Sequence, residues 1–280
     1  MKAGERQVTV SNGEIGDLRR PLDKYRCMAV VEYDGTEYLG FQIQGPASAR
    51  RIKDRTAQGS DRTIQGELER SLLQVTRHAT RVVGAGRTDA GVHAKGQVIH
   101  FDVGWSHPIA DLQRALNAVL AHDIAVVELR QVMPDFHARF DARSRQYLYT
   151  ILNRPVRSPL TERFALHVAQ PLDAEGMNQA CACLVGTHDF LPFGWPPRGE
   201  NTVRTVLRAG CRRSCDLVYV EIEADGFLRS MVRRVVGNLV LVGLGELSVE
   251  GMAGLLSLTH RRTPAVAAPA QGLCLIGVNY

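Results

Sequence analysis

The order of strand-like and helical segments predicts an α+β fold. Up to Val132 the segments follow one another as β-α-β-β-α-β, and a similar order recurs after Met133-Pro134. Each set is a split-βαβ unit, as in ferredoxin-like and RRM-like domains. A chain of 280 residues can bury the cores of two such units. We expect a flexible leader over 1–23, an N-terminal domain over 24–133 and a C-terminal domain over 134–280.

Hydrophobic periodicity defines the elements of the N-terminal half. Tyr25–Tyr33 alternates apolar and polar residues, as a half-buried strand does. Thr63 suits the N-cap of a helix whose apolar residues recur at helical spacing, at Ile64, Leu68, Leu72 and Val75. The other predicted segments of this half are strands Arg81–Val83 and Gln97–Val103, helix Ile109–Ala121 and strand Ile124–Val132.

The C-terminal half has the same alternation without any repeated sequence. Its predicted strands are Arg145–Leu152, Val203–Arg213, Val218–Ala224 and Leu273–Asn279. Its predicted helices are Ala174–Leu184, Phe227–Leu244 and Val249–Ser257. Two antiparallel sheets side by side would leave a central cleft between the halves.

The charge of the chain mildly favours a polyanionic partner. Its formal net charge is +5 and its isoelectric point is near 9.0. One segment, Pro46–Arg62, is locally basic through Arg50, Arg51, Lys53, Arg55 and Arg62. A solvated surface loop and a contact with RNA explain this segment equally well.

Several protein classes are disfavoured. No apolar run reaches the roughly 18 residues of a membrane span, and the polar N-terminus is unlike a signal peptide. The six cysteines are scattered, and the nine histidines lack ligand spacing. We therefore expect reduced thiols, no metal site and a cytoplasmic protein.

The segment Gly86–Ala94 carries the strongest chemical signal. It places Asp89 two residues after Arg87, in a glycine-rich turn that leads into a strand. A carboxylate held this way can act as a nucleophile, while the guanidinium can bind phosphate or keep the carboxylate ionised. The alternative is a tight hairpin in which Asp89 bonds its own backbone. Gly84-x-Gly86 begins like a dinucleotide-binding motif. That motif is rejected because Asp89 stands where its third glycine belongs, and because a strand follows where the motif requires a helix.

The string GAGRTDAGVHA resembles the signature of the TruA-type tRNA pseudouridine synthases. Further similar segments follow in the family's order, at Glu32–Gln42, Thr63–Leu72, Phe136–Ile151, Gly186–Phe190, Val203–Val206, Phe227–Gly237 and Gly272–Tyr280. The resemblance runs from about Tyr25 to the C-terminus. The basic segment Arg50–Arg62 departs from it, because the family joins these elements by a shorter connection.

The resemblance implies an enzyme that isomerises uridine to pseudouridine at positions 38–40 of the anticodon arm of several tRNAs. It also implies a homodimer with the active site in the central cleft. The reaction moves the base from an N1 to a C5 link with the ribose, without redox change or phosphate transfer. A carboxylate, a proton acceptor and an electrostatic clamp suffice, so we expect no cofactor.

The resemblance also assigns roles to individual residues. Asp89 matches the nucleophile, which attacks C6 or C1′ or promotes elimination to a glycal, and Arg233 matches its ion-pair partner. Tyr147 matches the active-site tyrosine that stacks on uracil or accepts the C5 proton. Arg87 is implied to hold the RNA open, and Leu273 to pack on the target base. From the residues alone, Arg233 is a surface helix arginine, Leu273 is a strand leucine, and Tyr149 competes with Tyr147.

Two other functions stay open. A synthase of the same fold could act on another tRNA position or another RNA. A non-catalytic RNA-binding module or folding chaperone would also suit two split-βαβ units with a basic surface. The presence of Asp89, Tyr147 and Arg233 favours catalysis, because binding alone requires none of them.

Overall fold

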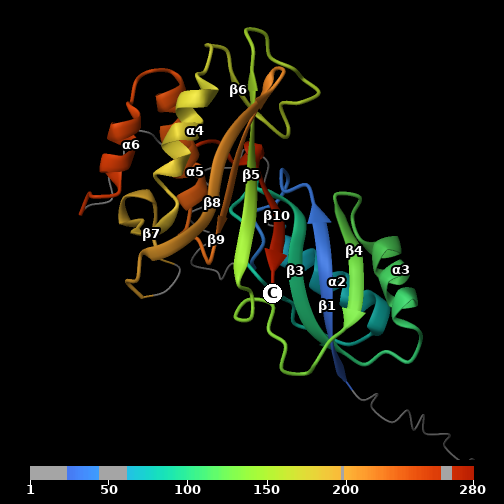
Figure 1. Ribbon diagram of the computed structural model, residues 1–280. Coiled ribbons are helices and arrows are strands. Elements are labelled where there is room, and N and C mark those ends of the chain that lie inside the picture. The colour runs from blue at the N-terminus through green and yellow to red at the C-terminus, as the bar shows by residue number, and fades with distance from the viewer. Residues whose placement is uncertain (1–23, 44–61, 197–198, 260–266) are drawn as a thin grey trace, which may run out of the picture.

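A single ten-stranded sheet runs through the molecule (Figure 1). The computed structural model describes residues 24–43, 62–196, 199–259 and 267–280. The strands lie along the sheet in the order β4 (Ile124–Gln131), β1 (Tyr25–Tyr33), β3 (His93–Val103), β10 (Leu273–Asn279), β5 (Ser144–Asn153), β9 (Leu217–Ala224), β8 (Val203–Ser214) and β7 (Gly186–Asp189). Two short strands flank this path: β2 (Val83–Gly84) pairs with β3, and β6 (Leu166–Val168) pairs with β5.

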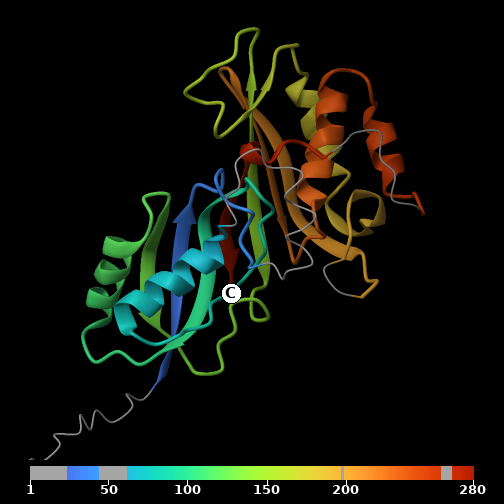
Figure 2. The ribbon, with the colours of Figure 1, turned by 180° about the vertical axis from the view of Figure 1, so that it is seen from behind.

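The α+β class is confirmed, but the expectation of two separate antiparallel sheets is wrong. Strand β10 joins the halves, since it pairs in parallel with β3 at Cys274↔His93 and antiparallel with β5 at Leu273↔Tyr149. The C-terminus therefore lies in the middle of the molecule (Figures 1 and 2). Pairing between segments so far apart in the chain depends on tertiary packing, which hydrophobic periodicity does not encode.

Helices accompany each half of the sheet. In the N-terminal half these are α2 (Ile64–Thr76) and α3 (Ile109–Val119), and Figure 2 shows α2 lying across the strands. In the C-terminal half they are α4 (Ala174–Ala182), α5 (Met231–Gly243) and α6 (Val249–Leu255). The predicted cap is confirmed, because Thr63 Oγ1 accepts a hydrogen bond from the Gly66 N–H at 3.2 Å. None of the described helices is long and apolar enough to cross a membrane.

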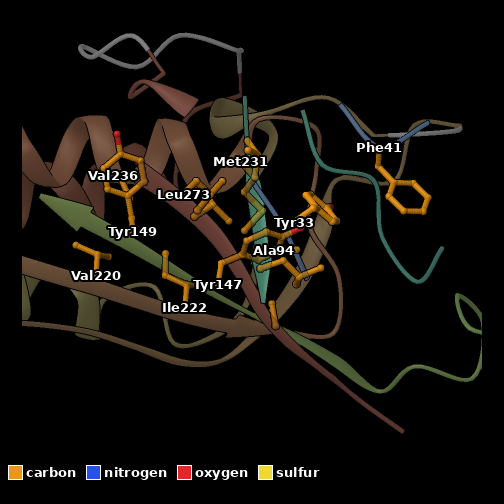
Figure 3. Packing of buried hydrophobic residues seen from close by; sticks show 14 of the residues in the cluster. Tyr33, Phe41, Ala94, Tyr147, Tyr149, Val220, Ile222, Met231, Val236 and Leu273 are labelled. Atoms are coloured by element: carbon orange, nitrogen blue, oxygen red, sulfur yellow. The ribbon is translucent and has the colours of Figure 1, made fainter. Parts of the chain in front are cut away.

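The hydrophobic core is continuous across the two halves. One cluster of buried side chains contains Phe101 of β3, Tyr149 of β5 and Leu239 of α5. Figure 3 shows part of this cluster, where β5, β10 and α5 meet. This junction brings together residues predicted for the active site from distant parts of the chain.

Most predicted elements are present with shifted ends. Strand β3 begins at His93 and not at Gln97, and the helix expected from Phe227 begins only at Met231. The reason for the second shift is Ser230, whose φ of 61° is left-handed and interrupts a helical path. Strands β6 and β7 were not predicted, because three or four residues are too few to show a periodicity.

Two predictions fall on segments outside the described residues. These are the leader 1–23 and the basic segment Arg50–Arg62 with the exception of Arg62 itself. The Arg62 guanidinium donates to Glu67 Oε1 at 2.8 Å and lies 4.9 Å from the centre of the Tyr38 ring. Arg62 therefore forms intramolecular contacts. The hypothesis of an RNA contact now concerns the other four basic residues, Arg50, Arg51, Lys53 and Arg55.

Candidate active site

The loop between β2 and β3 carries Asp89 and is fixed on several sides. The Thr88 carbonyl accepts the Phe41 N–H at 3.1 Å, and the Thr88 hydroxyl bonds that of Tyr33 at 2.8 Å. The Gln97 amide donates to the Gly86 carbonyl at 2.9 Å. Strands β1 and β3 and the segment around Phe41 thus hold the loop before any ligand binds.

The glycines in and just before this loop serve different purposes. Of Gly84, Gly86 and Gly91, only Gly91 adopts a positive φ, of 78°. Gly84 is required for space, because a Cβ there would lie 2.5 Å from the Phe41 ring. A Cβ on Gly86 would lie 4.0 Å from the Tyr147 hydroxyl, so the loop passes over that tyrosine.

The Asp89 carboxylate faces the other half of the chain. Its Oδ2 accepts a hydrogen bond from Ser230 Oγ at 3.0 Å and lies 3.4 Å from Arg233 Nη1. These partners are 141 and 144 positions further along the chain, so the geometry is not that of a hairpin aspartate bonding only locally. The side chain is 30% exposed, so it is accessible to a substrate.

Arg233 is held in place by Ala268. Its Nε donates to the Ala268 carbonyl at 2.7 Å, and the Ala268 N–H donates to the Arg233 carbonyl at 2.8 Å. Only 21% of the side chain is exposed. Arg233 is therefore not the surface helix arginine of the alternative interpretation; it supplies positive charge at a fixed position beside Asp89.

Ser230 is a site residue that the sequence analysis missed. It occupies the N-cap position of α5, yet its hydroxyl makes no cap bond to that helix and donates to Asp89. A non-glycine residue at positive φ is uncommon and costs of order 1–3 kcal/mol. The signal was a serine just before Met231, but the predicted helix ran through it.

The two competing tyrosines of β5 differ in the state of their hydroxyls. Tyr149 is fully buried, and its hydroxyl donates to the Pro269 carbonyl at 2.8 Å. Tyr147 is 8% exposed, and no group among the described residues hydrogen-bonds its hydroxyl. Its ring meets Phe227 edge-on, with centroids 5.1 Å apart. Tyr147 is thus the tyrosine available to a ligand.

Burial raises the pKa of the Tyr147 phenol above its ordinary value, and the nearby Tyr33 and Asp89 raise it further. The phenol is therefore neutral at physiological pH and is a weak proton acceptor. This environment suits a ring that stacks on a base or donates a hydrogen bond better than a free general base.

Leu273 and Arg87 are the two remaining predicted residues, and they differ in burial. Leu273 is 5% exposed at the start of β10, where it pairs in register with Tyr149 (Figure 3). Arg87 is exposed on the Asp89 loop. The structure thus brings Asp89, Arg233 and Tyr147 together, with Leu273 in the adjoining core and Arg87 at the surface.

Arg145 was also missed, and it connects the loop to the C-terminal half. Its guanidinium donates to four backbone carbonyls, those of Ala85, Arg139, Ala142 and Asp225, at 2.6–3.1 Å. Ala85 directly precedes Gly86 of the Asp89 loop. Arg145, two residues before Tyr147 in RQYLY, thus fixes the base of the loop.

Comparison with known proteins places the chain in the class of RNA-modifying isomerases. A family model described as tRNA pseudouridine synthase matches residues 29–141 and 180–280. The chain belongs to this tRNA pseudouridine synthase family, and it is an isomerase that acts on uridine in tRNA.

Individual relatives match over nearly the whole chain. A protein of Thermoanaerobacter sp. (strain X514), named tRNA pseudouridine synthase A, is 39% identical over 254 residues, which cover 90% of this chain and 98% of the relative. Relatives of the same name from Roseiflexus castenholzii and Neisseria meningitidis serogroup B are 40% and 41% identical. They cover 89% and 92% of this chain and 88% and 92% of their own lengths.

Proposed function

We propose that this protein forms pseudouridine at positions 38–40 of the anticodon stem-loop of several tRNAs, as a cytoplasmic homodimer without a cofactor. The observation that carries the proposal is the Asp89 carboxylate, which is positioned by Ser230 and Arg233 from the opposite half of the chain. The relatives named tRNA pseudouridine synthase A support the substrate class.

In this proposal Asp89 is the nucleophile. The N1–C1′ bond of the bound uridine breaks, the base turns, and a C5–C1′ bond forms. The C5 proton leaves and N1 gains a proton, so the product is an isomer of the substrate. Asp89 acts at C6, at C1′ or through a glycal. The positive charge of Arg233, 3.4 Å from the carboxylate, favours the attack of Asp89 on the bound uridine.

The other residues handle the extracted base. Tyr147 stacks on the uracil as a neutral phenol, and Leu273 closes the apolar side of the base. Arg87 occupies the space that the base leaves in the RNA stack. Extraction costs a few kcal/mol, which these contacts offset in part. The strand orders β4-β1-β3 and β10-β5-β9-β8 are consistent with two split-βαβ halves, 24–133 and 134–280, and the active site is proposed to lie in a cleft between them.

Asp89→Asn tests the proposal. We expect turnover to fall more than about 10³-fold, because loss of a nucleophile removes the chemical route. Affinity for tRNA should stay within a few-fold, since phosphate contacts supply most of it. Tritium release from C5-labelled tRNA measures turnover, and Asp111→Asn on the exposed face of α3 is the matched control.

Release by Asp89→Asn at a tenth or more of the wild-type rate would end the nucleophile assignment. Inactive wild-type protein with intact tRNA binding would favour the RNA-binding module. A map of pseudouridines in a strain lacking the gene would separate positions 38–40 from another target.

A further inference from the structure

Trp195 presents its indole to solvent from a rigid support. It follows a turn of 3-10 helix, Leu191–Phe193, in which Phe193 is fully buried. A Cβ on Gly194 would lie 2.6 Å from the Arg229 carbonyl, so the two backbones are in close contact. The Arg229 N–H donates to the Trp195 carbonyl at 2.8 Å. The backbone is thus fixed, while 41% of the residue stays exposed.

Two residues that contact Trp195 or its neighbour Gly194, Arg229 and Arg234, directly adjoin the two residues that contact Asp89. Arg229 immediately precedes Ser230, whose hydroxyl bonds Asp89. The Arg234 guanidinium lies 4.7 Å from the centre of the Trp195 ring and directly follows Arg233, the ion-pair partner of Asp89. The first turn of α5 therefore contacts both the Asp89 carboxylate, through Arg233, and the Trp195 ring, through Arg234.

The charge around the indole is uncompensated. Within the described ranges, neither Arg229 nor Arg234 has a carboxylate within ion-pair distance. The buried Nε of Arg234 also has no hydrogen-bond partner among those residues. An anionic ligand on this side would balance the charge.

An exposed aromatic ring with unbalanced arginines matches single-stranded nucleic acid. Any of the four bases can stack on an aromatic side chain, and arginines nearby attract the flanking phosphates. We propose that Trp195 is a stacking platform for an unpaired nucleotide of the tRNA next to the target uridine, with Arg229 and Arg234 attracting its phosphates. This inference rests on the proposed function, because it takes the ligand to be the substrate of the Asp89 site.

Binding and turnover of tRNA by Trp195 variants test the platform. We expect Trp195→Ala to weaken tRNA binding about 5- to 150-fold, the loss that one stacked base produces. The KM should rise accordingly, while turnover at saturating tRNA stays within about three-fold. Trp195→Phe keeps an aromatic face and should stay within about three-fold of wild-type affinity. Trp105→Phe, which changes the other tryptophan of the chain, is the matched control.

Fluorescence gives a second readout that does not require Trp195 to be replaced. The sequence has two tryptophans, so Trp105→Phe leaves Trp195 as the only reporter. We expect its emission to be quenched when tRNA is added and its quenching by iodide to decrease. In Trp195→Phe the remaining tryptophan should respond little.

Unchanged tRNA affinity in Trp195→Ala, or an unchanged Trp195 emission on binding, would overturn the platform. The exposed indole would then be better explained by a protein partner. These outcomes are distinct from failure of the proposed function, in which the wild-type protein itself would release no tritium from C5-labelled tRNA.

Discussion

Tyr147 and Tyr149 show how environment separates two identical side chains. Both lie on the same face of β5, but the Tyr149 hydroxyl donates to Pro269, whereas the Tyr147 hydroxyl lies near Gly86 of the Asp89 loop. Burial raises the pKa of Tyr147, so the free protein has no phenolate to act as a base. Any role in proton removal must therefore depend on the bound substrate.

The Tyr147→Phe variant separates stacking from proton transfer. The ring is kept, so we expect tRNA affinity within about three-fold of wild type. If the hydroxyl takes part in removing the C5 proton, turnover should fall about 100-fold or more. Single-turnover tritium release measures this step. Full activity of the variant would restrict Tyr147 to stacking and require another acceptor.

Ser230→Ala tests the hydroxyl that the sequence analysis missed. A hydrogen bond to a charged group contributes roughly 1.5–3 kcal/mol, and water can replace part of it because Asp89 is 30% exposed. We expect kcat to fall about 10-fold with KM within two-fold, since the hydroxyl orients the carboxylate and does not bind tRNA. Steady-state kinetics with tRNA give both values.

Ser230→Asn is the matched variant, because asparagine tolerates positive φ and retains a donor. Recovery of most of the activity with asparagine would support a positioning role. Equal loss in both variants, or a change confined to KM, would contradict it.

At the scale of elements, the Asp89 loop depends on contacts between strands. Arg145 of β5 ties the loop at Ala85 to the segment that holds Arg139 and Ala142. Four carbonyls around one guanidinium match the fixed fork of arginine donors and not the single ammonium of lysine. The loop is therefore positioned by a network that a conservative change would break.

Arg145→Lys should destabilise the fold by about 2 kcal/mol, since at least one carbonyl loses its charged donor. The midpoint of urea unfolding measures the change. Activity should fall as well, because the base of the Asp89 loop is loosened. Arg114→Lys, at an exposed arginine of α3, is the control and should leave the midpoint within error. An unchanged midpoint in Arg145→Lys would show that the network contributes little.

At the scale of the whole molecule, His100 links stability to pH. Its Nδ1 accepts the Ala138 N–H at 3.1 Å, so the buried ring is neutral. Burial, then the nearby His137 and Arg26, lower the pKa of His100 to about 4. Below a pH of about 6.5 the unfolded chain binds a proton that the folded chain does not. The free energy of unfolding should therefore fall as the pH drops from about 6.5 to about 4.

His100→Asn should flatten this dependence, because the asparagine Oδ1 can accept the Ala138 N–H without titrating. We expect the wild-type protein to lose a few kcal/mol more than the variant over that range. Urea unfolding at pH 7, 5.5 and 4.5 measures the difference. His122→Asn, at an exposed histidine, should keep the wild-type slope. Equal slopes in all three proteins would remove His100 from the explanation.

The sequence by itself determined the local structure and the identity of the nucleophile candidate. Strands β1 and β10 have the predicted bounds, and Thr63 caps α2, because periodicity and capping depend on neighbouring residues. The residues around Asp89 and Tyr147 were recognised through family motifs. Without those motifs, Tyr147 and Tyr149 could not be ranked.

Only the tertiary structure decided how these pieces meet. It joined the two predicted sheets through β10, and it set Ser230 and Arg233 against a carboxylate more than 140 positions away. It also gave Tyr147 a free hydroxyl among the described residues while that of Tyr149 is bonded. Periodicity specifies which face of an element is buried; which distant element it is buried against follows from the packing of the whole chain.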